Sequence, residues 1–321
     1  MGRISSLLND VDQYSTLIKS EIGGSKILWE AKMLYCFLRY GAKPVDYWRF
    51  QFWRKSTSEC DKYLTSMRYS NAYKRLKREL GNNNISGDKF AEYRLFAEFI
   101  KREWIEVTKT TPDTMIESFI QKHYCVIAKP NKGEQGKGVM KIFANDKEAI
   151  HTLLRAKAND DYVLEECLVN TPEISKINPS SLNTIRATTF VDKNGDTHIL
   201  SIILRVGAPG SHVDNWGAGG VGYNFDVETG ICNCMGLDKK NRSYICHPGS
   251  NFKMVGFELP DYTALKKYVL RLVKVVPQAW YVGWDIAITP NGYDLIEMNC
   301  PAGHDMFQSF NNPVYRFFKH R

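Results

Sequence analysis

The chain has 321 residues, of which 43% are hydrophobic and 24% are charged, a balance typical of a soluble globular protein of one to three domains. No apolar run approaches the roughly 20 residues that span a bilayer, and residues 1–8 lack a hydrophobic signal region, so we expect a cytoplasmic protein without a transmembrane segment. The net charge of +8 is uneven, because residues 1–110 carry 20 lysines and arginines against 13 aspartates and glutamates.

Residues 1–84 are predicted to form a helical region that ends in a polar break at residues 81–84. Within residues 25–40 the apolar side chains recur at helical spacing, at Ile27, Leu28, Ala31, Leu34, Tyr35 and Leu38. An aromatic cluster follows at Tyr47, Trp48, Phe50, Phe52 and Trp53. The cluster favours a hydrophobic core, although with the neighbouring basic residues it could also face a sugar, a base or a membrane surface. The basic charge likewise fits either a solvated helix face or attraction to an anionic partner.

A small subdomain is predicted over about residues 85–165, where helices and strands alternate. We expect a helix over residues 89–101 and a second helix that Asn145 caps and that runs to about residue 158. Strands are expected over residues 125–128, 140–143 and 162–165.

A glycine-rich turn joins the first two of these strands. It follows Lys129 and contains Gly133, Gln135, Gly136 and Gly138. Glycines let the backbone turn sharply and direct N–H groups at an anion, and Lys129 can add a point charge. No Gly-Lys-Ser/Thr opens a helix here, so this is not a Walker A loop. The turn alone is weak evidence, because many such loops are plain turns.

A second subdomain is predicted over about residues 166–321, with strands near residues 184–192, 197–206, 221–226, 282–289 and 294–298 and an amphipathic helix over residues 261–275. Its last two strands form a hairpin closed at residues 290–292. Asp285 can sit across from Glu297, and Asn299 leaves the same face as Glu297. Three oxygen ligands, two of them charged, suit Mg²⁺. The alternative is a hairpin with polar residues facing water, but the apolar flanks indicate burial.

The order of these motifs resembles the ATP-grasp superfamily, and most closely the sugar-transfer-associated ATP-grasp proteins, which are related to the α-L-glutamate ligases. The resemblance runs from about Asp88 to Gln308, whereas residues 1–84 match poorly. It rests on residues 88–89, 126–138, 162–166, 181–186, 213–215, 219–220 and 297–299. It implies an α+β ATP-grasp fold, in which two α+β subdomains grip ATP, preceded by the N-terminal helical region.

The resemblance also implies a nucleotide site. Lys89 and Lys129 match the lysines that hold phosphates, and the glycine-rich turn, with Gly133, Gln135, Gly136 and Gly138, would close over the phosphates as a lid. Glu165, Glu166 and Leu168 match the linker whose backbone meets the adenine, and Glu173 lies where an acid approaches the ribose. Mg²⁺, with Mn²⁺ as the alternative ion, would be held by Asp285, Glu297 and Asn299.

The catalytic residues that the resemblance implies are Arg186, Arg205 and Asn183. Arg186 would counter the charge on the transferring γ-phosphoryl group and on the tetrahedral species that follows, and Arg205 could clamp a phosphate or the substrate carboxylate. The acceptor site would involve the loop that contains His212, Asp214, Asn215, Gly219 and Gly220. His212 could serve as a base for the incoming amine.

The implied reaction joins a carboxylate to an amine through an acyl phosphate, with ADP and phosphate as products. The relatives suggest a uronic acid or amino acid, either free or linked to a nucleotide or lipid, in polysaccharide or glycoconjugate biosynthesis. Two alternatives stay open: a phosphotransferase acting on a hydroxyl, and a non-catalytic module that binds an anionic glycan or lipid. We expect no nucleic-acid partner, and contact with a membrane surface stays open.

Overall fold

The computed structural model describes the whole chain except residues 1–2, 82–85, 134–136, 212–213, 215 and 320. The α-helices are α1 (Arg3–Ile22), α2 (Lys26–Tyr40), α3 (Pro44–Arg49), α4 (Thr57–Cys60), α5 (Ser66–Leu80), α6 (Lys89–Leu95), α7 (Asp113–His123), α8 (Lys147–Ala156), α9 (Pro172–Ser175), α10 (Tyr262–Val275) and α11 (Tyr315–Lys319). Short 3₁₀ helices are η1 (Phe52–Arg54), η3 (Ala97–Phe99), η4 (Trp216–Ala218) and η5 (Phe307–Phe310). The strands are β1 (Trp104–Val107), β2 (Cys125–Pro130), β3 (Met140–Phe143), β4 (Tyr162–Glu166), β5 (Thr184–Val191), β6 (Thr197–Val206), β7 (Val221–Phe225), β8 (Gly236–Leu237), β9 (Ser243–Tyr244), β10 (Tyr281–Thr289) and β11 (Gly292–Asn299).

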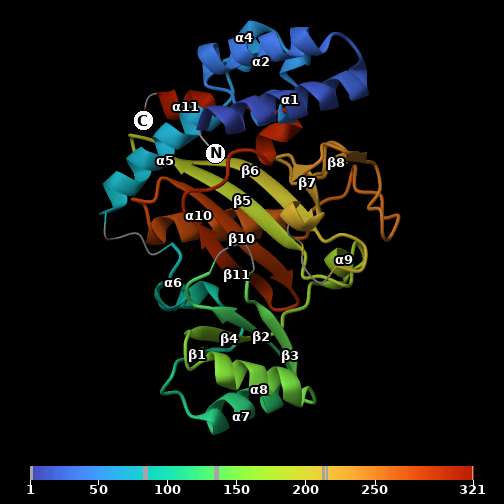
Figure 1. Cartoon of the computed structure of the whole chain (residues 1–321). Helices are drawn as coiled ribbons and strands as arrows, with labels where there is room; N and C mark the ends of the chain where they lie inside the picture. Colours follow the sequence, from blue (N-terminus) through green and yellow to red (C-terminus); the bar gives the residue numbers. More distant parts are fainter. Residues whose placement is uncertain (1–2, 82–85, 134–136, 212–213, 215, 320) are drawn as a thin grey trace.

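Two antiparallel sheets organise the fold. The smaller sheet has the strand order β1-β4-β2-β3, with α7 and α8 beside it (Figure 1). The larger sheet has the order β11-β10-β5-β6-β7-β8-β9, and the N-terminal helices lie at its far end from the smaller sheet (Figure 1). The predicted α+β class, with helices before two α+β units, is therefore confirmed.

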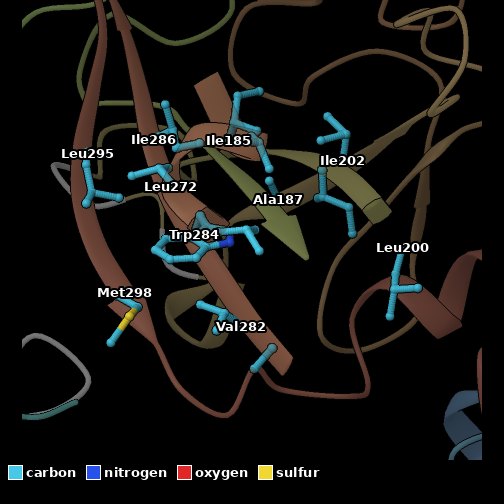
Figure 2. Packing of buried hydrophobic residues seen from close by; sticks show 14 of the residues in the cluster. Ile185, Ala187, Leu200, Ile202, Leu272, Val282, Trp284, Ile286, Leu295 and Met298 are labelled. Carbon is cyan, nitrogen blue, oxygen red and sulfur yellow. The ribbon is translucent and has the colours of Figure 1, made fainter. Parts of the chain in front are cut away.

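The main core lies against one face of the larger sheet. Ile185 and Ala187 of β5 point into it, together with Trp284 of β10 and Leu272 of α10 (Figure 2). Side chains alternate between the two faces of a strand, so Arg186 and Thr188 emerge on the opposite face of β5. The large apolar area removed from water on one face thus fixes which polar side chains reach the other face.

The N-terminal region folds onto the larger sheet. The side-chain amide of Gln308 in η5 accepts a hydrogen bond from Leu64 N (2.9 Å) and donates one to Leu64 O (3.0 Å). Tyr315 N donates to Lys62 O at 2.9 Å. The aromatic cluster at residues 47–53 packs as a separate core with Trp29, so it is core rather than a binding surface.

The α2 helix forms as its spacing predicts, but a different face is buried. Ile27 is 77% exposed and Leu38 is 76% exposed, whereas Trp29 and Met33 face the N-terminal core. The helix is apolar on more than one side, so the periodicity does not decide which side packs.

Two other local predictions are corrected. Asp146 rather than Asn145 caps α8, because its carboxylate accepts from Ala149 N at 2.9 Å. The helix expected over residues 89–101 ends at Leu95 and continues as η3, since Phe96 and Phe99 turn into the core against Trp284 and Tyr268. The strand β1 and the helix α7 have no counterpart in the predicted elements. Within the described part of the chain, none of the helices combines the length and apolar character that crossing a bilayer requires.

Candidate active site

A row of charged side chains crosses three neighbouring strands of the larger sheet. Glu297 on β11 pairs in register with Asp285 on β10, and Asp285 pairs with Arg186 on β5. Residues that pair directly across antiparallel strands lie on the same face, about 5 Å apart. The hairpin predicted from the sequence therefore brings its two acids together, with an arginine beside them.

Asp285 is buried and paired with two arginines. Arg186 reaches it through Nε and Nη2, the latter at 2.9 Å from Oδ2, and Arg205 Nη2 lies 3.0 Å from the same oxygen. Burial acts to raise the pKa of Asp285, but the two guanidinium groups outweigh it and lower the pKa below its ordinary value. Gly283 leaves the space for this pairing, because a Cβ there would lie 3.2 Å from Arg186 Cδ.

Asp214 extends this cluster, and Asn183 does not. Asp214 Oδ2 lies 3.4 Å from Arg205 Nε and accepts from Thr184 N at 3.1 Å. The Asn183 amide is only 1% exposed and is engaged by the backbone of Asn178 (2.9 Å) and by Ser181 Oγ (2.9 Å). β5 begins after Asn183, so its side chain stays in this buried network instead of joining Arg186.

Glu297 is the acid with an open carboxylate. It is half-buried and accepts no hydrogen bond from any residue that the structure describes. Burial raises its pKa, and so does Asp285, while the charges of Lys129, Lys89 and Arg186 act in the opposite direction. The positive charges of Lys89, Lys129 and Arg186 therefore all favour the ionised form of the Glu297 carboxylate, and thus act to lower its pKa.

The donor set at the hairpin fits a hard divalent cation through Glu297 and Asn299. The carboxylate of Glu297 is open, and Asn299 donates its Nδ2 to Asp285 Oδ2 at 3.5 Å, which leaves the amide oxygen for another partner. Asp285 fits less well, because the two arginines occupy its oxygens. Across the described ranges, no group of three or more His, Cys, Asp or Glu side chains is arranged to hold a metal.

Lys129 belongs to a buried charge network that the sequence did not indicate. Its Nζ lies 2.5 Å from Glu165 Oε1, and Arg102 Nε lies 2.8 Å from Glu165 Oε2. Arg102 also pairs with Asp294 of β11, and Tyr93 donates its hydroxyl to Glu165. Burial alone would lower the pKa of Lys129, but Glu165 raises it above the ordinary value, so the lysine keeps its charge. The network connects the smaller sheet to the larger one.

Lys89 reaches the glycine-rich turn. Its Nζ donates to Gly133 O at 2.9 Å. Gly138 has φ +73°, and a Cβ there would lie 2.9 Å from Pro130 Cγ, so the end of the turn requires glycine. Gln135 and Gly136 lie outside the described residues.

The predicted adenine linker is already partly engaged in the sheet. Glu166 N donates to Glu103 O at 2.9 Å, and the side chain of Glu165 turns to Lys129 and Arg102. Leu168 N donates to none of the described residues, so it is the linker N–H available to a ligand. Glu173 is exposed on α9 and makes no contact that brings it to this group.

A cavity of about 590 Å³ lies beside Arg186 and Arg205. Its described lining also includes Trp216, Lys239 and Asp305. Gly219 and Gly220 follow the lining residues of η4 without lining the cavity themselves, and Gly219 has φ +97°. His212 and Asn215 fall outside the described residues.

Several site residues were missed by the sequence reasoning: Glu92, Tyr93, Arg102, Lys239 and Asp305. Glu92 is fully buried beside Glu297 and the two lysines, and burial together with Glu297 raises its pKa to about 8. Among these residues, only Asp305 had a local signal, namely its position in a glycine-containing loop just after the hairpin of β10 and β11. Arg102 stands between Lys101 and Glu103, a run that looks solvent-exposed.

The model of the sugar-transfer associated ATP-grasp family matches residues 88–316. No curated protein sequence is significantly similar to the chain. Among solved structures, D-alanyl-alanine synthetase A from Vibrio cholerae is 13% identical, with a TM-score of 0.48 over 73% of this chain and 62% of its own. The N5-carboxyaminoimidazole synthetase from Staphylococcus aureus complexed with ADP is 12% identical, with a TM-score of 0.43 over 73% and 51% of the two chains. The D-alanine–D-alanine ligase from Bacillus anthracis complexed with ATP is 16% identical, with a TM-score of 0.42 over 71% and 60%.

The chain thus spans less than two thirds of the length of each of these proteins. The family match covers most of the chain, including both sheets and every charged residue of the row across β5, β10 and β11. The chain therefore belongs to the sugar-transfer associated ATP-grasp family.

Proposed function

We propose that the protein is an ATP-dependent carboxylate–amine ligase that works in polysaccharide or glycoconjugate biosynthesis. In this reaction a carboxylate oxygen attacks the γ-phosphorus of ATP and releases ADP, and an amine then attacks the acyl carbon of the acyl phosphate and releases phosphate. The observation that carries the proposal is the row of Glu297, Asp285 and Arg186 across β11, β10 and β5, in which the carboxylate of Glu297 accepts no hydrogen bond from the described residues.

The charged residues would have two separate roles, which are the binding of ATP phosphates and the neutralisation of charge on the transferring group. Lys89 and Lys129 would bind phosphate oxygens under the glycine-rich turn, and Glu165 holds Lys129 in its charged form. Arg186 and Arg205 would neutralise negative charge that develops during transfer, because a planar guanidinium can bind two oxygens at once. Asp285 orients both arginines through its carboxylate.

Glu297 and Asn299 would hold Mg²⁺, which when bound neutralises the phosphate charge and aligns the phosphate oxygens. Asp285 would bind the ion as well only if Arg186 or Arg205 left its carboxylate to bind the substrate. The cavity beside the arginines would receive the carboxylate and the amine, with Asp214 fixing one wall through Arg205.

The test is an assay for ADP release from the whole chain with Mg²⁺, ATP and pooled uronic acids and amino acids, repeated with hydroxylamine in place of the amine. An acyl phosphate reacts with hydroxylamine to give a coloured hydroxamate, so hydroxamate that depends on both ATP and the carboxylate supports the ligase. ATP-dependent phosphorylation of a hydroxyl, with a product stable to hydroxylamine, would instead identify a phosphotransferase. Absence of any ADP release would contradict both.

A further inference from the structure

The cavity beside Arg186 and Arg205 has an uneven distribution of charge. Its described lining includes three cations, Arg186, Arg205 and Lys239, and a single carboxylate, that of Asp305. The two arginines are already paired with Asp285 and Asp214, which are not among the lining residues, whereas Lys239 forms no ion pair with a described residue. The arginines stand next to the row that would hold the transferring group, and Asp305 belongs to the segment that follows β11. An acceptor that carried only negative charge would be repelled by the carboxylate of Asp305.

One oxygen of Asp305 is open toward a ligand. Met306 N donates to Oδ1 at 3.0 Å, whereas Oδ2 accepts no hydrogen bond from the described residues. Arg49 Nε is the nearby cation, at 3.7 Å from Oδ2, which is an ion pair but too long for a hydrogen bond. The side chain of Asp305 is 39% exposed, so a bound molecule can reach it.

Arg49 comes from the N-terminal region, at the end of α3, and is itself buried. Its guanidinium lies 4.9 Å from the ring of Trp216, which lines the cavity, and its buried Nη1 has no hydrogen-bond partner among the described residues. Asn241 Nδ2 donates to Arg49 O at 3.3 Å and so fixes the end of the helix. Arg49 therefore holds both Trp216 and Asp305 from behind the cavity wall.

We propose that Asp305 binds the acceptor amine as its ammonium form, that Lys239 binds an anionic group of the same molecule, and that Arg49 is a positioning residue for Asp305. The bound ammonium group loses one proton as its nitrogen attacks the acyl carbon, and the departing phosphate takes up that proton. The acceptor is then of the amino-acid class, with an amine and a carboxylate on one molecule. A carboxylate in a partly closed cavity recognises an ammonium group through a charge-assisted hydrogen bond, and a lysine of the same cavity lining recognises a carboxylate. This inference rests on the proposed ligase function.

The test compares two nucleophiles on the whole chain with MgATP and the carboxylate that supports ADP release. Hydroxylamine is neutral near neutral pH and has no need of an ammonium site, whereas each of the twenty amino acids presents an ammonium group. For Asp305→Asn we expect the ratio of amide to hydroxamate formation to fall by about tenfold or more, the effect of losing one charged hydrogen bond. The change should lie in the KM for the amino acid, because the interaction is made on binding.

Two further variants separate positioning from folding. Arg49→Met should raise the KM for the amino acid without a matching change in kcat, while Arg54→Met, an exposed arginine of η1, should not change it. Lys239→Met should remove the preference for an amino acid over its amide. An Asp305→Asn enzyme that uses amino acids as well as the wild type, or a wild type that forms hydroxamate but accepts no amino acid, would overturn the inference. Absence of hydroxamate from the wild type would instead overturn the ligase function.

Discussion

Replacing Glu165 with glutamine tests whether the buried charge network holds the two sheets together. Glu165 accepts from Arg102 Nε at 2.8 Å and from Lys129 Nζ at 2.5 Å, and Tyr93 donates its hydroxyl to the same carboxylate. Glu165, Arg102 and Tyr93 are buried, and Lys129 is half-buried. Glutamine keeps the shape of the side chain but removes the negative charge, so Lys129 loses its ion-pair partner and Arg102 keeps only Asp294.

The pKa of Glu165 gives the size of the effect. Burial acts to raise that pKa, but Arg102 and Lys129, with hydrogen bonds from Lys129 and Tyr93, lower it from 4.5 to about 2. At about 1.4 kcal/mol for each pH unit of difference, the ionised carboxylate stabilises the fold by about 3 kcal/mol. Breaking a buried ion pair by removing one partner costs about 3–5 kcal/mol, so the two estimates agree.

The sign of the pH dependence follows from a lowered pKa. The stabilisation is complete above the unfolded pKa of 4.5 and is lost as the pH falls toward about 2. In urea unfolding, Glu165→Gln should therefore be less stable than the wild type by about 3 kcal/mol near neutral pH, and the difference should narrow as the pH falls below about 4.

Glu166→Gln is the matched control, because Glu166 is the next residue, is half-buried and accepts only from Glu103 N at 3.2 Å among the described residues. Its effect should stay below about 1 kcal/mol. If Glu165→Gln behaved like this control, or if its deficit did not change with pH, the network would not hold the sheets together in the way described.

The nucleotide site can be tested in three more ways. Saturating MgATP should raise the melting temperature, since a ligand at one hundred times its Kd stabilises the folded state by about 2.7 kcal/mol, and no shift would contradict the site. Glu297→Gln should abolish Mg²⁺-dependent ADP release without lowering the melting temperature, whereas Glu148→Gln on the exposed face of α8 should release ADP normally. Arg186→Lys should lower kcat far more than ATP affinity, because lysine keeps the positive charge but cannot bind two oxygens at once as a guanidinium does. An equal fall in kcat and in ATP affinity would show that Arg186 binds ATP in the ground state and has no special role in the transition state.

The sequence predicted the hairpin that carries Asp285 and Glu297, but not the irregularity that pairs them. The turn at residues 290–292 alone would set Asp285 opposite Ile296, and a one-residue register shift between Asp285 and Ile286 brings Asp285 opposite Glu297 instead. Arg186 joins them because β5 is the next strand in the sheet, and the motif match suggested this before the register was known.

Sequence reasoning failed where contacts join distant parts of the chain. Arg102 is buried because Asp294, from a strand of the other sheet, turns toward it, and nothing around Arg102 signals this. Asn183 shares a motif with Arg186 but lies before β5 begins, so its amide satisfies the backbone of a buried loop. Asp305 and Arg49 are in contact although more than half of the chain separates them in sequence, and no local sequence pattern predicts such a contact.

The clasp between Gln308 and the backbone of Leu64 has a consequence for how substrate preference could change. The segment between β11 and η5 carries Asp305, and the clasp fixes the end of that segment to the helices that precede α6. The residues that would bind phosphate or its metal ion lie elsewhere, on α6, in the smaller sheet and on β5 and β11. Exchanging the N-terminal helices with those of a related protein should therefore alter which acceptor is used, while the transfer of phosphate from ATP to the carboxylate is unchanged. Acceptor preference and phosphate transfer can thus change independently during evolution.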